Sequence, residues 1–211
     1  MSCGKVFILG DSYSTFIGHI PESCSPWYVD GGHENTDVTC VEQTWWHKLI
    51  RETGSELVLN SSYSGTTVCH TGYNGGDCSH ISFIARFEKL IEEGFFAENR
   101  IDTVFVFGGT NDSWAGSPVG GLKYDDWSRE DLYSVLPAFC YLINKIKNVL
   151  PKARIISIIN TELKPEITEG FIEASKKYGI EAVVLKDIGK TAGHPNKSGM
   201  EQIKTQVMSV L

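Results

Sequence analysis

The chain has 211 residues, of which 41% are hydrophobic and 21% are charged, and this composition is ordinary for a globular protein with one substantial core. Its formal net charge is -7, and an acidic surface repels phosphate backbones, so the charge argues against a nucleic acid partner. No stretch approaches the roughly 20 consecutive apolar residues of a membrane span, so we expect no insertion into a membrane.

The first ten residues, "MSCGKVFILG", lead straight into an apolar run and lack the long apolar region and cleavage site of a signal peptide. If the chain begins at its native start, this favours a cytoplasmic protein. The six cysteines form no C-x-x-C pair and no zinc-ligand spacing, so we favour free thiols. Disulfides between Cys24 and Cys40, or between Cys69 and Cys78, are the alternative.

Short apolar runs and longer amphipathic stretches alternate along the chain. The runs predicted as strands cover residues 5–9, 55–60, 102–109, 153–159 and 181–185. The stretches predicted as helices cover residues 43–54, 80–94, 128–150, 164–179 and 196–211. In the third of these helices, Ser128 and Asp131 have the spacing of a helix cap, and Pro137 should kink or split the helix.

This alternation predicts an α/β fold with a five-stranded parallel sheet, covered by helices on both faces. The result is a three-layer α/β/α sandwich, flavodoxin-like in outline, and we expect one domain over residues 1–211. Two connections, of about residues 13–44 and 112–128, are too long to be simple turns. Both leave the carboxyl ends of strands, the edge at which such sheets bind ligands, so both loops are predicted to be functional.

Polar residues follow four of the five predicted strands at this same edge. The segments are "GDS" with Ser12, "NSSYSGTT" with Gly65, "GGTND" with Asn111 and "GHPNKSGM", in which His194 is expected to open the last helix. Taken singly, each segment is a weak signal, because such residues are common in turns, and His194 alone fits a helix start better than a base. Together they supply a hydroxyl, a histidine, a side-chain amide and an accessible backbone N–H, which are the groups that acyl transfer requires.

The order of these four segments resembles the SGNH hydrolases, also called GDSL esterases or lipases, over nearly the whole chain. The resemblance implies that fold, and ester hydrolysis through a serine nucleophile without a cofactor. It implies that Ser12 is the nucleophile, displayed by a sharp turn at Gly10 that Asp11 braces, and that His194 is its base. It also implies an oxyanion hole formed by the N–H groups of Ser12 and Gly65 and by the Asn111 amide.

One position departs from the family pattern. The family usually places an aspartate three residues before the histidine, and this chain has Thr191 there. A carboxylate stabilises the imidazolium that forms during attack, which a hydroxyl cannot match. Three alternatives follow: Asp187 orients the ring from seven residues upstream, a backbone carbonyl holds it in a Ser–His dyad, or the protein is slow or inactive.

Aromatic side chains in the two long loops are candidate substrate contacts, in particular Trp27, Trp114 and Trp127. Such rings suit the faces of sugars, although they can equally serve to anchor the loops. His70 and His80 flank a glycine-rich loop without the spacing that converges metal ligands, so we expect no metal site.

These residues favour an esterase that removes a small acyl group, preferably acetyl, from a carbohydrate or another polar alcohol. A small-molecule ester is then the expected partner. One alternative is a catalytically impaired module of the same fold that binds sugar or acyl ligands. Another is a lipase or lysophospholipase type that acts on longer acyl chains. A flavodoxin-like nucleotide or flavin binder is disfavoured, because the first strand–helix connection lacks a phosphate-binding glycine pattern.

Overall fold

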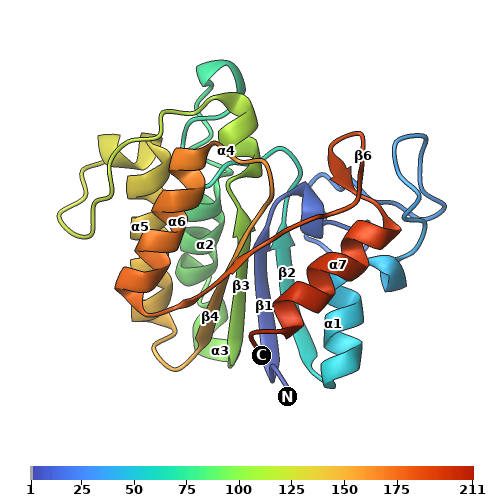
Figure 1. The fold of residues 1–211 in the computed structure, drawn as a ribbon. Helices are drawn as coiled ribbons and strands as arrows, with labels where there is room; N and C mark the ends of the chain where they lie inside the picture. The colour runs from blue at the N-terminus through green and yellow to red at the C-terminus, as the bar shows by residue number, and fades with distance from the viewer. Residues whose placement is uncertain (1) are drawn as a thin grey trace.

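A parallel five-stranded sheet forms the centre of the protein in a computed structural model that describes residues 2–211 (Figure 1). Its strands are β1 (Lys5–Gly10), β2 (Glu56–Ser62), β3 (Thr103–Gly108), β4 (Arg154–Ile159) and β5 (Glu181–Val184). They lie in the order β2-β1-β3-β4-β5, and every neighbouring pair is parallel. All five predicted strands are therefore confirmed.

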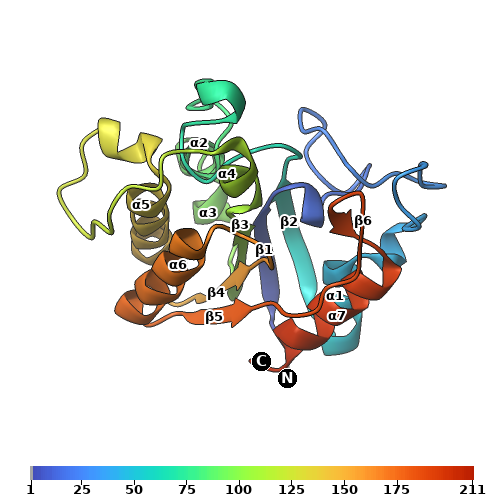
Figure 2. The ribbon, with the colours of Figure 1, turned by 45° about the horizontal axis from the view of Figure 1, so that its top comes forward.

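Helices cover both faces of this sheet. They are α1 (Trp45–Thr53), α2 (Phe83–Glu92), α3 (Phe95–Glu98), α4 (Thr110–Ala115), α5 (Val135–Val149), α6 (Pro165–Tyr178) and α7 (Lys197–Met208). Helices α1 and α7 lie on one side of the sheet, and α2, α5 and α6 lie on the other, as Figures 1 and 2 show. The predicted three-layer α/β/α sandwich is confirmed. Among residues 2–211, no helix combines the length and apolar content needed to cross a bilayer.

The central strands are mostly apolar on both faces because helices cover both sides of the sheet. In β1, Phe7 and Leu9 belong to the core under α2 and α5, whereas Val6 and Ile8 belong to the core under α1 and α7. Successive side chains of a strand point to opposite faces, so one continuous apolar run supplies both cores. The tryptophan pair at the start of α1 is buried in the second core.

The predicted helix over residues 128–150 begins later than expected. Ser128 and Asp131 do exchange capping hydrogen bonds, of 2.7 and 3.3 Å, but the turn that they cap is a short 3₁₀ segment, Glu130–Tyr133. The α-helix starts only at Val135. Pro137 therefore lies in its first turn, where a missing N–H breaks no helical hydrogen bond. The predicted stretch is split at Ser134, whose backbone is extended, so the split is confirmed and there is no kink at Pro137 within the helix.

His194 lies in a β-hairpin rather than at the start of the last helix. Strands β6 (Lys190–Thr191) and β7 (His194–Pro195) are antiparallel and joined by Ala192 and Gly193, which have φ of 48° and 77°. Positive φ at both central residues is the conformation of a tight two-residue hairpin turn. Helix α7 begins three residues later, capped by Asn196, whose Oδ1 accepts a 2.9 Å bond from Gly199 N–H.

The carboxyl ends of the strands share one edge of the sheet, which is uppermost in Figure 1. Helix α4, the β6–β7 hairpin and both long loops gather there, as the turned view in Figure 2 also shows. Helix α4 occupies the start of what the sequence suggested was a loop, so Asn111 sits on a rigid element.

Candidate active site

Two residues 182 positions apart in the sequence meet at this edge. Ser12 opens the 3₁₀ turn Ser12–Ser14 directly after β1, and His194 comes from β7. The Ser12 Oγ lies 2.9 Å from the His194 Nε2, and the two residues are only 2% and 7% exposed. This is the geometry of a hydroxyl hydrogen-bonded to its own general base.

The strand end that displays Ser12 is braced by its two preceding residues. Asp11 caps the turn, because its Oδ1 accepts a 3.0 Å hydrogen bond from Tyr13 N–H. Gly10 does not adopt a left-handed φ, contrary to its expected role in a sharp turn. It is needed for close packing instead, because a Cβ there would lie 2.5 Å from the Ser62 Oγ of β2.

Burial raises the pKa of the Asp11 carboxyl to about 7, with the Tyr13 N–H bond and the Arg86 guanidinium opposing the shift and Asp112 adding to it. The Asp11 Oδ2 is buried and has no hydrogen-bond partner in the described chain. A proton added to that oxygen leaves the cap on Oδ1 intact, so the turn keeps its shape in either state of Asp11.

The imidazole of His194 is held by a backbone carbonyl. Its Nδ1 lies 3.2 Å from the Ala192 carbonyl oxygen, across the hairpin turn. A carbonyl can only accept, so Nδ1 carries the proton of the neutral ring and Nε2 remains free to accept the Ser12 hydroxyl. Of the two alternatives for how the ring is held, the structure matches the backbone carbonyl, the arrangement of a Ser–His dyad.

Asp187 does not take part in this arrangement. It is exposed in the connection after β5, and no hydrogen bond among residues 2–211 joins it to His194. The prediction that Asp187 could orient the ring is therefore corrected: the tight hairpin brings its own carbonyl to Nδ1 instead. Thr191 is exposed and pairs directly with His194 across the two short strands.

Aromatic rings enclose the imidazole on several sides. The indole of Trp27 stacks on it with ring centroids 3.6 Å apart and an angle of 8° between the planes. Trp114, which is 45% exposed, presents a second indole at 5.7 Å and 70°. Tyr13 lies 5.4 Å away, and its hydroxyl donates a 2.5 Å hydrogen bond to the Gly193 carbonyl, which ties the hairpin to the serine turn.

This surrounding lowers the pKa of His194 to about 4. Burial is the main cause, the bond to the Ala192 carbonyl opposes it, and positive charge on His33 and Lys190 lowers the pKa further. The ring is consequently neutral at physiological pH, which is the state required of a base.

Trp127, the third aromatic candidate, lies away from the dyad. Its ring packs edge-on against Tyr141 of α5 at 5.5 Å, and its indole N–H donates a 2.9 Å bond to the Lys123 carbonyl. It covers apolar surface of α5, so its predicted substrate role is corrected to one of anchoring the second long loop.

The remaining candidates, Asn111 and Gly65, lie on segments that a hydrogen bond holds together. The Asn111 Nδ2 donates a 3.0 Å bond to the carbonyl of Thr66, which directly follows Gly65. Gly65 is exposed with φ of 78°, a conformation that glycine adopts without strain, and its N–H donates to no other group in the turns and loops of residues 2–211. Asn111 is almost fully buried.

Tyr73 also reaches this site, although no motif in the sequence pointed to it. Its hydroxyl donates a 2.8 Å hydrogen bond to the Asn111 Oδ1 from the 3₁₀ turn Tyr73–Gly75. The tyrosine lies in the glycine-rich loop between His70 and His80, whose sequence raised only the question of metal binding. Glycine content indicates a loop that can fold back on itself, but it does not say which side chain reaches the active site.

Two buried charges hold the strand ends in place beneath the site. The Arg86 guanidinium donates to the Gly10 carbonyl at 3.0 Å and to the Thr66 Oγ1 at 3.2 Å, and it also bonds the Ser61 carbonyl. Arg86 thereby connects the end of β1, which carries Ser12, to the segment that carries Gly65. Its position in an amphipathic helix gave no sign of these distant partners, so the sequence did not predict this role.

Asp112 secures the same segment from the other side. Its carboxylate accepts the N–H groups of Val68 and Cys69 at 2.9 to 3.1 Å. Burial raises the pKa of the Asp112 carboxyl, and these N–H bonds oppose the shift. Asp112 stabilises backbone at the strand end, although its partners lie 43 and 44 residues away in the sequence.

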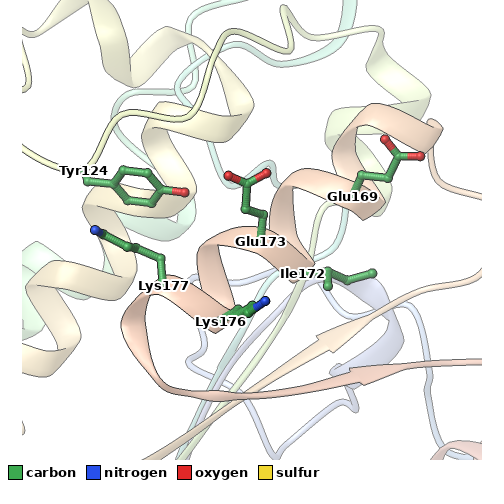
Figure 3. Close-up of a pocket in the computed structure, with 6 residues that line it drawn as sticks. All are labelled: Tyr124, Glu169, Ile172, Glu173, Lys176 and Lys177. Atoms are coloured by element: carbon green, nitrogen blue, oxygen red, sulfur yellow. The ribbon is translucent and has the colours of Figure 1, made fainter.

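Other features of the surface lie outside this site. A hollow of about 940 Å³ runs along α6, lined by two acidic and two basic side chains with Tyr124 and Ile172, and contains neither residue of the dyad (Figure 3). Within residues 2–211, no three His, Cys, Asp or Glu side chains are grouped so as to hold a metal ion. The six cysteines are free thiols in the structure.

The chain matches the model of one protein family along nearly all of its length, and that family is described as GDSL-like lipase/acylhydrolase, over residues 4–211. No curated protein matches this sequence. Two solved structures described as GDSL-like lipases are closely similar to it. The one from Bacteroides uniformis has 50% identity and a TM-score of 0.92, covering 99% of this chain and 95% of the other. The one from Bacteroides ovatus has 44% identity and the same TM-score, covering 100% and 98%.

An acetyl xylan esterase from Butyrivibrio proteoclasticus shares the fold at a TM-score of 0.62 with 17% identity, covering 100% of this chain and 64% of the other. The resemblance seen in the four strand-end segments is thus confirmed by the family match and by the two close structures. The chain belongs to the GDSL-like lipase/acylhydrolase family.

Proposed function

We propose that this protein is a serine esterase that removes a small acyl group, preferably acetyl, from a carbohydrate or another polar alcohol. The observation that carries the proposal is the 2.9 Å distance between the Ser12 Oγ and the His194 Nε2, the ring nitrogen left to accept because Nδ1 faces the Ala192 carbonyl. A serine hydroxyl is too basic to attack an ester unaided at neutral pH, and a neutral imidazole at this distance is the base that can take its proton.

In the first half of the reaction, the Ser12 Oγ attacks the ester carbonyl carbon while its proton moves to the His194 Nε2. The tetrahedral intermediate collapses, the bond to the alcohol oxygen breaks, and the alcohol leaves with the proton from Nε2. Water then attacks the acyl-enzyme in the same way, with His194 Nε2 taking its proton and returning it to the Ser12 oxygen. This step gives the free acid and restores the Ser12 hydroxyl. The two halves together consume one water molecule, and no electrons are transferred to a cofactor.

The negative charge on the oxygen of the tetrahedral intermediate must be stabilised by hydrogen-bond donors. We assign them to the N–H groups of Ser12 and Gly65 and to the second hydrogen on the Asn111 Nδ2, the first being bonded to the Thr66 carbonyl. In related enzymes, each such donor contributes about 3 kcal/mol of transition-state stabilisation. Because Asn111 sits at the start of a helix and is buried, its amide is held in place before the substrate arrives.

The positive charge on His194 needs stabilising too, and no carboxylate contacts the ring among the described residues. The Ala192 carbonyl keeps Nδ1–H oriented, and the stacked Trp27 indole presents its electron-rich face to the imidazolium. A cation over tryptophan contributes about 0.5 to 2 kcal/mol. We therefore assign Trp27 to the support of the base, in addition to any contact with the alcohol.

The proposed substrate class follows from the walls of the site. Trp114 offers an exposed indole beside His194, where the departing alcohol must receive its proton, and an aromatic face suits a sugar ring. The shared fold with an acetyl xylan esterase supports the same choice. Because the two close structures are described as GDSL-like lipases, hydrolysis of esters with a longer acyl chain is the competing alternative.

Labelling and chain length test this proposal together. Ser12→Ala should reduce esterase turnover by about 10⁶-fold, because no nucleophile remains, and the folded state should be unchanged by circular dichroism. A fluorophosphonate should label Ser12 in the unmutated chain, as read by peptide mapping. Among p-nitrophenyl esters, acetate should be cleaved with the highest kcat/KM.

Each arm of this experiment can contradict a different part of the proposal. A fluorophosphonate adduct on Ser14 or Ser64 would refute the assigned nucleophile. A kcat/KM that rises from acetate to octanoate would favour the lipase alternative. A well-folded chain with no labelling and no turnover would favour a binding module.

The pKa of the base predicts the acid side of the pH profile. His194 must be neutral to accept a proton, and its pKa is lowered to about 4, so kcat/KM should fall only as the pH drops through about 4. An exposed histidine would place this decline near pH ~6.5. The measurement is kcat/KM for a neutral ester from about pH 3.5 to 8, with circular dichroism to confirm folding at each pH. A midpoint at or above the ordinary histidine value would contradict the buried, carbonyl-held base.

Two substitutions distinguish a dyad from a triad. Asp187→Asn should reduce kcat less than about tenfold, whereas loss of a triad aspartate costs about 10⁴-fold. Thr191→Asp places a carboxylate opposite His194 in the hairpin, so it should raise the midpoint of the acid limb and increase kcat/KM, while the uncharged control Thr191→Asn should do neither. A loss of about a thousandfold in a folded Asp187→Asn variant would overturn the dyad.

A further inference from the structure

We propose that Tyr73 positions the oxyanion hole by holding the Asn111 carboxamide in its working orientation. This inference deepens the proposed function and rests on it. Tyr73 would not touch the reacting atoms itself. Its hydroxyl would act through Asn111, whose Oδ1 lies 2.8 Å away.

The orientation of the Asn111 amide follows from its two partners. The Thr66 carbonyl can only accept a hydrogen bond, so the amide nitrogen must face it, at 3.0 Å. The amide oxygen then faces Tyr73, which must be the donor. With both ends of the amide engaged, only the second hydrogen on Nδ2 is free, and the plane of the amide fixes the direction in which that N–H points.

Without the Tyr73 hydroxyl, the amide would be held at one end only. Rotation about its side-chain bonds would then carry the free N–H away from the developing oxyanion. The hydroxyl also polarises the amide, because a hydrogen bond to a carbonyl oxygen strengthens the same amide's N–H as a donor. Both effects act in the transition state, where the oxyanion carries its charge.

The loop that carries Tyr73 is built to hold it at this place. Thr71 and Asp77 form a bridge that closes the loop, and the Thr71 Oγ1 donates a 2.7 Å bond to the Tyr133 carbonyl. The Thr71 carbonyl in turn accepts a 2.8 Å bond from the Ser117 Oγ, just beyond α4. The turn Tyr73–Gly75 lies next to α4, and the Tyr73 hydroxyl bonds Asn111 of that helix.

The tyrosine is 45% exposed, so its ring stands at the border of the site while its hydroxyl points inward. Burial, aided by the negative charges of Asp11 and Asp112, raises the pKa of the Tyr73 phenol above its ordinary value. The hydroxyl consequently stays protonated, and able to donate, throughout the pH range in which the esterase would work.

The test is Tyr73→Phe, which removes the hydroxyl and keeps the ring. We expect kcat for p-nitrophenyl acetate to fall about 3- to 20-fold with KM nearly unchanged, which is the size of one hydrogen bond acting in the transition state. Tyr133→Phe is the matched control. It removes a hydroxyl that contacts Asp77 of the same loop at 3.4 Å, and it should leave kcat unchanged.

A double-mutant cycle separates positioning from a general structural effect. In the Asn111→Ala background no amide remains to be oriented, so adding Tyr73→Phe should cause no further loss of kcat. A loss of equal size in both backgrounds would overturn the inference, and so would an effect confined to KM, which would make Tyr73 a substrate contact. An unchanged kcat in an active, fluorophosphonate-labelled Tyr73→Phe variant would contradict this inference alone. Absence of activity and labelling in the unmutated chain would instead contradict the proposed function, and this inference with it.

Discussion

The proposed catalytic arrangement depends on one hydrogen bond across a tight turn, from the His194 Nδ1–H to the Ala192 carbonyl. Ala192 has φ of 48°, a left-handed conformation that costs a residue with a Cβ about 1 to 2 kcal/mol. The turn places this carbonyl against the ring of a residue only two positions further along the chain. The bond fixes which nitrogen carries the proton, and this leaves Nε2 to face Ser12. Burial lowers the pKa of the ring, and the bond to an uncharged carbonyl opposes this only in part, which is why the stacked Trp27 matters.

The rest of the site is held together by the buried side chains of Arg86 and Asp112, which bond to protein groups around the strand ends. Arg86 bonds the ends of β1 and β2 and the Thr66 side chain, and Asp112 secures the next residues of the same segment. Buried charges are costly unless their hydrogen bonds are satisfied, and here backbone groups satisfy them. The strand ends therefore keep their spacing without a ligand, which is the preorganisation that oxyanion stabilisation requires.

Sequence patterns predicted the features that depend on residues close together in the chain. The apolar runs identified all five strands because parallel strands are buried on both faces, and the strand-end motifs identified Ser12 and His194 as the residues that meet. Contacts that depend on loop conformation were not predictable in this way. A backbone carbonyl was one of three alternatives for holding His194, and only the conformation of the six-residue hairpin decides among them. Tyr73 reaches Asn111 from a loop with no recognisable pattern. The predicted substrate role of Trp127 was wrong for the same reason, since an aromatic loop residue can pack on a helix as readily as on a substrate.

The tautomer of His194 is the sharpest test of the dyad, because it reports the Ala192 bond itself. Long-range ¹H–¹⁵N correlation spectra of the folded protein at neutral pH would assign it, with the His194→Gln variant identifying the resonances. The carbonyl-held dyad requires a neutral ring protonated at Nδ1 and bare at Nε2, remaining neutral as the pH is lowered to about 5. A ring protonated at Nε2, or an imidazolium at neutral pH, would contradict the dyad, because neither state leaves a base for the Ser12 hydroxyl.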